Sequence, residues 1–296
     1  MQRKTVSDFA PEVMQLFDQF VHGLIDRRGF LNGAAKYAVG GVTAAGLLEA
    51  LSPQFAAAQQ VAKDDKRISA RVVEYDSPQG YGRMRGYLVA PAKVGGKLPA
   101  ILVVHENRGL NPHIEDIARR LALDGFLAFA PDALFPLGGY PGDEDKARDL
   151  FAKLDQAKCR TDFIAGAGFL KSLPECNGKV GTVGFCYGGG IANMLATRIP
   201  DLAAAVPFYG AAPSAEDAAK IKASLLIHYA ETDERINGMW PAYETALKVA
   251  GVKYEMFKYP GTQHGFNNDT TPRYDEVQAK IAWQRTVAFF RKNLAG

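Results

Sequence analysis

The amino-acid sequence predicts an α/β protein whose central, mostly parallel sheet is covered by helices on both faces. From about residue 68 onward, short β-rich runs alternate with segments of helical periodicity, which is the pattern of this architecture. Several β-rich runs are uninterrupted apolar stretches, as expected of strands that are buried on both faces. We therefore interpret residues 59–296 as one α/β domain.

The individual elements follow from these periodicities and from the turn residues between them. We expect strands at residues 71–75, 86–90, 100–105, 127–130, 180–185, 204–209, 224–229 and 254–259. We expect helices at residues 113–124, 143–173, 189–198, 215–220, 239–250 and 273–293.

Composition and charge exclude several functional classes. The 296 residues carry a formal net charge of +3, from 35 basic and 32 acidic side chains without long runs, so no clustered basic face for nucleic acid is indicated. The three cysteines show no C-x-x-C spacing and the five histidines no paired ligand spacing, so neither a zinc site nor a disulfide framework is indicated. A disulfide between Cys159 and Cys176 remains open.

Residues 1–58 resemble an export leader. Residues 26–58 contain DRRGFL, then a Gly/Ala-rich apolar stretch at 34–51, then AAA at 56–58. Paired arginines, an apolar stretch and small residues in this order resemble a twin-arginine signal cleaved before Gln59, which predicts a periplasmic or exported protein. The alternative is a cytoplasmic protein with a retained helical arm, because residues 9–25 suggest an amphipathic helix that packs on the enzyme or on a second subunit. No stretch is long and apolar enough for an ordinary membrane span.

A nucleophile motif lies at residues 184–188, where the sequence is GFCYG. A strand, one residue and a glycine-rich helix start match the G-x-nucleophile-x-G turn of the α/β-hydrolase fold, with Cys186 in the place of serine. Glycines are needed there because side chains beside the strained turn would collide with the neighbouring strand and helix. The helix start would lower the pKa of the thiol and offer a donor to an oxyanion. The alternative for Cys186 alone is a buried, inert cysteine.

Two further residues give this thiol a mechanism. Asp233 follows an expected strand, and His264 follows the last one, so nucleophile, acid and histidine stand in the chain order of this fold. His264 would accept the thiol proton, and Asp233 would fix the orientation of its ring. Separately, Asp233 could be a helix cap and His264 an ordinary loop residue.

At this point the sequence resembles the dienelactone hydrolase family over roughly residues 71–294. The matching segments are VVHENRGLN at 103–111, PD at 131–132, GTVGFCYGG at 181–189, Asp233 and HGF at 264–266. The resemblance implies a triad of Cys186, Asp233 and His264. It also implies that Glu106 takes the thiol proton and swings away when substrate binds; otherwise Glu106 is a loop carboxylate that Arg108 neutralises.

The oxyanion hole and the substrate pocket are placed by analogy with the fold. The N–H groups of Tyr187 and Asn107 would hold the oxyanion. The two family arginines that grip a substrate carboxylate are missing from their usual positions, although Arg108 and Arg273 could replace them. A neutral pocket is an equal alternative, and the candidate substrate-binding residues are Arg108, Phe135, Tyr140, Trp240 and Phe266.

We therefore expect a cofactor-free hydrolase that cleaves a small-molecule ester or lactone through a thioester on Cys186. One alternative is a general carboxylesterase or peptidase with an apolar pocket. Another is a non-catalytic binding or redox protein on the same fold. A dehalogenase is disfavoured, because its nucleophile is an aspartate.

Overall fold

The structure is a computed structural model that describes residues 4–295. Its described strands form one eight-stranded sheet in the order β1-β2-β4-β3-β5-β6-β7-β8. The pairs β1·β2 and β2·β4 are antiparallel, and every other pair is parallel. The expected mostly parallel α/β fold is confirmed. The strands are β1 (Ile68–Ser77), β2 (Gly82–Pro91), β3 (Leu98–Val104), β4 (Leu127–Pro131), β5 (Cys176–Phe185), β6 (Ala204–Phe208), β7 (Ser224–Ala230) and β8 (Tyr254–Tyr259).

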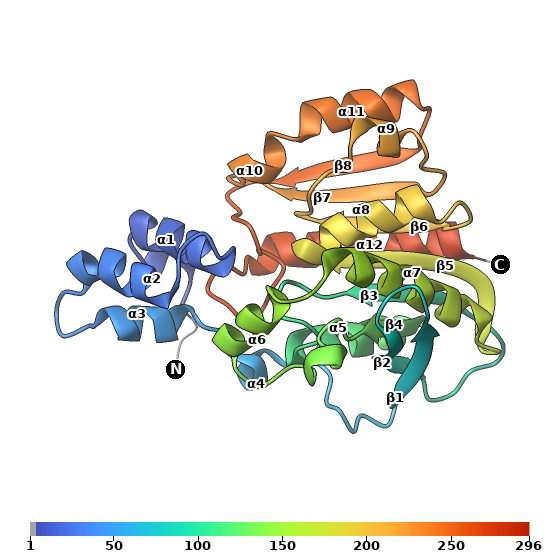
Figure 1. Ribbon diagram of the computed structural model, residues 1–296, viewed down its shortest axis with the longest axis horizontal. Coiled ribbons are helices and arrows are strands. Elements are labelled where there is room, and N and C mark those ends of the chain that lie inside the picture. Colours follow the sequence, from blue (N-terminus) through green and yellow to red (C-terminus); the bar gives the residue numbers. More distant parts are fainter. Residues whose placement is uncertain (1–3, 296) are drawn as a thin grey trace.

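Helices cover both faces of this sheet (Figure 1). On one face, apolar side chains of α5 (Pro112–Leu123) and α12 (Glu276–Leu294) pack against the strands. The larger set on the opposite face comprises α6 (Glu144–Phe151), α7 (Gln156–Ser172), α8 (Tyr187–Arg198), α9 (Ala215–Ala218) and α11 (Trp240–Val249). Strands β4 and β6 are buried along their whole length, as their uninterrupted apolar sequences predict.

Two helix boundaries differ from the prediction for reasons of capping. The single helix expected at 143–173 is two helices, because the Asp155 carboxylate accepts hydrogen bonds from the N–H groups of Ala157 and Lys158 and starts α7 anew. The helix expected from residue 273 begins at Glu276, because Asp275 caps it through the N–H of Gln278. Arg273 is thereby left in the preceding loop.

The amino-terminal residues form a separate helical arm, which is the blue segment of Figure 1. Its elements are η1 (Val6–Asp8), α1 (Pro11–Val21), α2 (Arg27–Ala34), η2 (Ala35–Tyr37), α3 (Ala44–Leu51) and α4 (Phe55–Ala58). Helices α1 to α3 bury a small core of their own, in which Phe17, Phe20 and Phe30 contact one another and Leu48 and Leu51 are also buried. The predicted apolar signal stretch is thus not one continuous helix, since a 3₁₀ turn and a loop separate α2 from α3.

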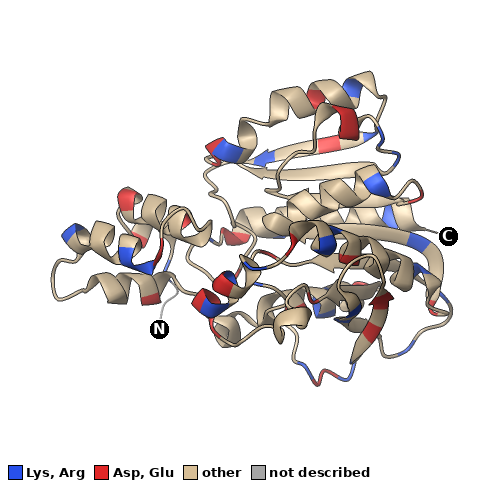
Figure 2. Ribbon diagram, viewed as in Figure 1, with Lys and Arg blue, Asp and Glu red and all other residues tan. Residues whose placement is uncertain are grey.

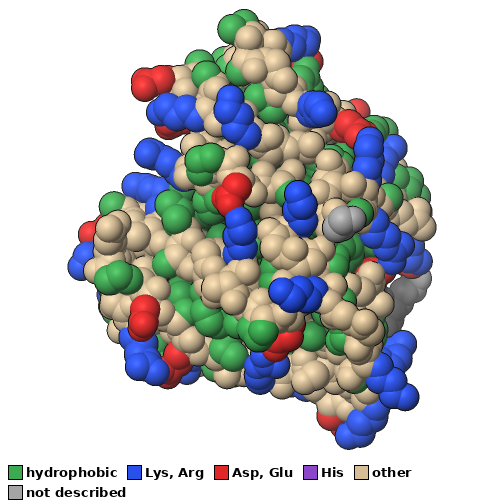
Figure 3. Space-filling model, turned by 90° about the vertical axis from the view of Figure 1, so that its right-hand side faces the viewer, with side chains coloured by type: hydrophobic (Ala, Val, Ile, Leu, Met, Phe, Trp, Pro, Cys, Tyr) green, Lys and Arg blue, Asp and Glu red, His purple; other side chains and the backbone are tan. Residues whose placement is uncertain are grey.

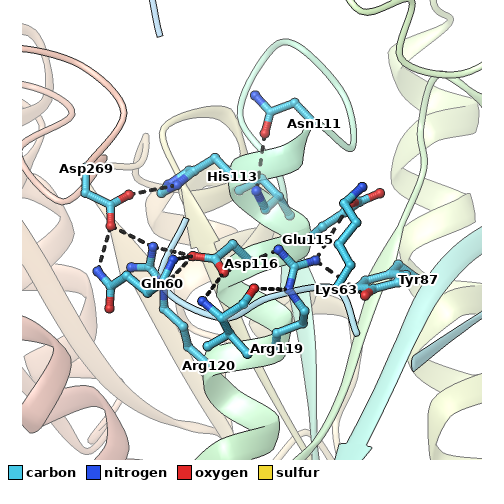
Figure 4. A network of polar contacts seen from close by, with 12 residues as sticks. Gln60, Lys63, Tyr87, Asn111, His113, Glu115, Asp116, Arg119, Arg120 and Asp269 are labelled. Carbon is cyan, nitrogen blue, oxygen red and sulfur yellow. Dashed lines mark hydrogen bonds and ion pairs between the residues drawn. The ribbon is translucent and has the colours of Figure 1, made fainter. Parts of the chain in front are cut away.

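A buried polar network joins the segment after the arm to helix α5 and to the loop after β8 (Figure 4). The Asp116 carboxylate accepts hydrogen bonds from the N–H groups of Gln60 and Val61 and pairs with Arg120, which also pairs with Asp269. His113 lies 3.2 Å from the other Asp269 oxygen. Burial alone would raise the pKa of Asp269, but His113 and Arg120 lower it. The network fixes the loop that carries residues 261–275.

Charged side chains are distributed over the whole molecule. Acidic and basic residues are scattered over helices, strands and loops in Figure 2, and on the face shown in Figure 3 the basic side chains are dispersed among apolar and neutral ones. Among residues 4–295, no helix combines the length and the apolar character needed to cross a membrane.

Candidate active site

Cys186 occupies a strained turn between β5 and α8. Its backbone angle φ is +57°, in the region that side chains rarely adopt. A Cβ on Gly184 would lie 1.9 Å from the carbonyl oxygen of Gly188, and one on Gly188 would lie 2.3 Å from that of Val104. Because backbone cannot move aside at these points, the glycines permit the strand, the turn and the helix to approach closely enough to expose the thiol.

His264 and Asp233 reach this thiol from the ends of β8 and β7. Asp233 Oδ2 lies 2.5 Å from His264 Nδ1, and both residues are buried. Asp233 also caps α10 (Glu234–Asn237), with its Oδ1 3.3 Å from the N–H of Ile236. Asp233 therefore caps α10 through one carboxylate oxygen and contacts the His264 ring through the other, so the cap holds the carboxylate in place beside that ring.

Cys186 and His264 each favour the charged form of the other. Burial alone would raise the pKa of the Cys186 thiol, but the neighbouring His264 and His22 outweigh it and lower this pKa to about 6. Burial likewise opposes the charged form of His264, yet Cys186 and Asp233 raise the pKa of its ring. Both shifts favour a thiolate beside an imidazolium over the neutral pair.

The candidate oxyanion donors come from the start of α8 and from the loop after β3. Tyr187 is the first residue of α8, so its N–H is one of those that a helix does not use internally. Asn107 follows β3, and its side chain lines the same cavities as Cys186. Glu106 lies beside it, and its carboxylate accepts a hydrogen bond of 2.9 Å from Asn268 Nδ2. In this structure Glu106 is held by the loop after His264.

Comparison with protein families matches residues 84–294 to the family model described as "Dienelactone hydrolase family". The chain belongs to the dienelactone hydrolase family. A second model, described as YqhI-like, matches residues 1–38.

Relatives of this dienelactone hydrolase-family chain carry hydrolase names. "Putative hydrolase fragment YghX" of Escherichia coli K12 is 54% identical over 38% of this chain and 97% of its own length. A "Putative carboxymethylenebutenolidase" of Salmonella typhi is 34% identical over 76% of this chain and 88% of its own length. The crystal structure of a "Putative Dienelactone Hydrolase" from Klebsiella pneumoniae matches with a TM-score of 0.67 at 30% identity, covering 76% of this chain and 99% of the other. These matches support the hydrolase class.

The arm lies outside the dienelactone hydrolase match, yet it enters the active site. His22, just after α1, places its Nε2 3.9 Å from the Cys186 sulfur and 3.4 Å from Nε2 of His264. Its Nδ1 lies 2.8 Å from the carbonyl oxygen of Asp18 and 3.3 Å from its carboxylate. Sequence reasoning missed His22. The available signal was the i, i+4 spacing of Asp18 and His22 on the amphipathic segment at residues 9–25.

Several contacts hold the arm against the hydrolase body. The carbonyl oxygen of Val21 accepts hydrogen bonds from Asn107 Nδ2 at 2.9 Å and from Arg108 Nη2 at 3.3 Å. Further contacts are an ion pair between Arg27 and Asp145 and the cation–π stacking of Arg148 on Phe20 and of Arg273 on Phe17. The alternative of an arm packed on the enzyme therefore describes the structure, and the first twin arginine takes part in the packing.

Two cavities open beside Cys186. One, of about 340 Å³, lies between the arm and the body and is lined by Arg108, Tyr140 and Arg273 as well as by His264. The other, of about 610 Å³, is lined on its apolar side by Ile191, Met194, Ala211, Ala212 and Pro213.

The remaining candidate substrate-binding residues lie elsewhere within the described chain. Phe135 packs under Arg85, and Trp240 packs among Tyr229, Tyr243 and Tyr254. Phe266 is fully buried behind Tyr209. The structure does not bring these three side chains to the cavities that Cys186 lines, because each fills an apolar layer instead.

Cysteine and histidine at this site also have the chemistry of metal ligands. The Cys186 sulfur and one nitrogen each of His22 and His264 all lie within 4.8 Å of one another. Arg235 Nη2, however, lies 3.1 Å from His22 Nε2 and places a positive charge where a cation would bind. All three cysteines fall within the described residues and are free thiols, so the open Cys159–Cys176 disulfide is not formed here.

Proposed function

We propose that this protein hydrolyses an ester or lactone through Cys186, His264 and Asp233. The observation that carries the proposal is the strained position of Cys186 together with the hydrogen-bonded pair of His264 and Asp233. A thiolate attacks well and also leaves well, so strained or activated oxygen esters suit it better than amides.

The proposed reaction has two steps, formation of a thioester on Cys186 and hydrolysis of that thioester. The thiolate forms a bond to the carbonyl carbon, and the carbonyl electron pair moves to oxygen, where the Tyr187 and Asn107 N–H groups stabilise it. As the intermediate collapses, the C–O bond breaks and the leaving oxygen takes the proton from His264. His264 then removes a proton from water, which attacks the thioester and releases the acid and the Cys186 thiolate.

We further propose that one substrate group is a carboxylate that Arg108 and Arg273 bind. Both arginines line the cavity next to Cys186, and both side chains are only 7% exposed. Within residues 4–295, Arg108 Nε and Arg273 Nη1 form only long ion pairs, of 3.8 Å with Glu144 and of 3.7 Å with Asp18, and none of Arg108 Nε, Arg273 Nε and Arg273 Nη1 makes a hydrogen bond. Burial lowers the pKa of Arg108 although Glu144 opposes the shift, and an anionic ligand would relieve the cost of burying this charge.

A carboxylesterase with an apolar pocket is the second candidate. The larger cavity favours it, because its apolar side chains could take a long acyl or alcohol group. Comparing kcat/KM for anionic lactones with that for neutral esters of increasing chain length separates the two.

Replacing Cys186 by alanine tests the whole proposal. We expect Cys186→Ala to abolish hydrolysis of enol lactones and p-nitrophenyl acetate, and iodoacetamide to label Cys186 ahead of Cys159 and Cys176, which are both buried. Full activity in this variant would refute the mechanism. A wild-type protein that is silent on a broad panel of lactones and esters would favour the binding or redox alternative.

Export remains our proposal on the evidence of residues 26–58 alone. It rests on the paired arginines and the apolar stretch that follows them, and it does not depend on cleavage before Gln59.

A further inference from the structure

The amino-terminal arm delivers a histidine to the nucleophile. The ring of His22 lies edge-on to that of His264, with 4.7 Å between the ring centroids, and both rings direct Nε2 towards the same region as the Cys186 sulfur. Each ring also has its Nδ1 against an aspartate, Asp18 for His22 and Asp233 for His264. The nucleophile thus lies between two similarly supported imidazoles.

We propose that His22 is a second catalytic histidine, which donates an N–H hydrogen bond to the Cys186 sulfur and keeps the sulfur in its thiolate form. The inference rests on the proposed role of Cys186 as nucleophile. On ionisation the S–H bond breaks, its electron pair stays on sulfur, and the proton moves to Nε2 of His264, while the already protonated His22 donates its Nε2–H to the thiolate. No external acid or base is consumed.

The surroundings of His22 favour its charged form. Although burial disfavours charge, Asp18 and the Cys186 sulfur raise the pKa of His22 to about 10. Burial alone would raise the pKa of Asp18, but its contact with His22 and the charges of Arg273 and His264 lower it to about 2. With the thiolate, Asp18 and Asp233 negative and both imidazoles positive, a single negative charge is left, which Arg273, 3.7 Å from the Asp18 carboxylate, balances.

Arg235 competes with the Cys186 sulfur for a contact with Nε2 of His22. Its Nη2 lies 3.1 Å from His22 Nε2, and a guanidinium can only donate, so Nε2 either accepts from Arg235 or donates to sulfur. Arg235 is exposed and can turn into solvent, whereas His22 is held at its other nitrogen. The two contacts are therefore alternative states of one site.

The other charged groups near the thiol do not take over this role. Arg273 lies 3.7 Å from the Asp18 carboxylate, Arg108 binds the Val21 carbonyl, and the Glu106 carboxylate is held by Asn268. The family resemblance assigns thiol activation to Glu106, whereas the geometry assigns it to the arm. Thiol activation in this chain would then need a segment that the dienelactone hydrolase match does not include.

The rate of iodoacetamide labelling of Cys186 as a function of pH tests this inference without any substrate. In the wild type we expect a midpoint near 6, and His22→Gln should raise it by at least about one pH unit, which is roughly a tenfold slower reaction below the midpoint. Asp18→Asn should give a smaller shift of the same sign. The matched control is Leu24→Gln, at an exposed position of the same arm, which should leave the midpoint unchanged.

Three outcomes would overturn the inference. They are an unchanged midpoint in a folded His22→Gln protein, a midpoint that moves in Glu106→Gln instead, and an equal shift in Leu24→Gln, which would mean general loosening of the arm. Circular dichroism establishes that each variant is folded. Because labelling reads the thiol directly, failure of the proposed hydrolysis would appear separately, as activity that survives in Cys186→Ala.

Discussion

At the scale of single residues, the ionisation of Cys186 determines how activity depends on pH. The pKa of this thiol is lowered from 9.0 to about 6, so the thiolate is present above this value and is lost as the pH falls through it. We expect kcat/KM for a neutral ester to rise with pH with a midpoint near 6. Measurement between pH 4.5 and 9 checks this, and a midpoint at about 8.5, the value of an ordinary thiol, contradicts it.

Arg108 and Arg273 make a residue-scale prediction about the substrate. Arg108→Gln and Arg273→Gln should each weaken the use of a lactone that bears a carboxylate. A charge-assisted hydrogen bond contributes about 1.5–3 kcal/mol, which corresponds to a loss in kcat/KM of about 10- to 100-fold. The methyl ester of the same lactone is the control, and it should lose much less. Equal losses on both substrates would show that the arginines only support the pocket.

The sequence was sufficient for some of these residues and insufficient for others. Cys186 lies in a local motif whose glycines reveal the turn, and Asp233 and His264 follow recognisable strands. His22 is 242 positions away from His264, and only folding of the arm brings them together. The positions of the aromatic residues were harder to predict, because an apolar side chain can line a pocket as well as fill a core. Tyr140 lines a cavity, whereas Trp240 packs among tyrosines.

At the scale of elements, the crossing of β5, α8 and the end of β3 depends on residues without a Cβ. Gly184→Ala would put a methyl group 1.9 Å from backbone, so either the strand or the helix must shift. We expect a loss of about 1–3 kcal/mol in the free energy of unfolding, as in other overpacked sites, and a strong loss of activity. Chemical denaturation and ester hydrolysis measure the two effects.

The control for this prediction is Gly168 in α7. A Cβ there meets no atom within 4 Å, and the residue is exposed. Because glycine is a poor helix former, Gly168→Ala should raise stability by about 0.5–1 kcal/mol and leave activity unchanged. If Gly184→Ala behaves in the same way as Gly168→Ala, then the close packing of the turn is not required.

The elements themselves were largely predictable from periodicity, and their boundaries were not. The eight strands were all expected, because apolar runs between turn residues are a local signal. The split between α6 and α7 depended on the side chain of Asp155, which could equally have remained in a continuous helix. The later start of α12 left Arg273 in a loop, and this one difference brings a cation to the candidate substrate cavity.

At the scale of the whole molecule, residues 1–58 have two incompatible interpretations. Cleavage before Gln59 would remove His22 and leave Asn107 Nδ2 without its partner on Val21. It would also discard a packed core of three phenylalanines and the ion pair between Arg27 and Asp145. A leader that contributes atoms to the active site should stay attached to the active enzyme.

We therefore expect the protein that hydrolyses esters in cells to retain its first 58 residues, whichever compartment it occupies. Intact-mass analysis of the active fraction after cell fractionation measures this directly. A mass that begins at Gln59 with full activity would support the predicted export signal and exclude His22 from the mature enzyme. If instead the active protein retains residues 1–58 and its Cys186 is labelled with a midpoint near pH 6, then these residues are part of the catalytic unit. The charge that stabilises the thiolate would in that case come from outside the hydrolase domain.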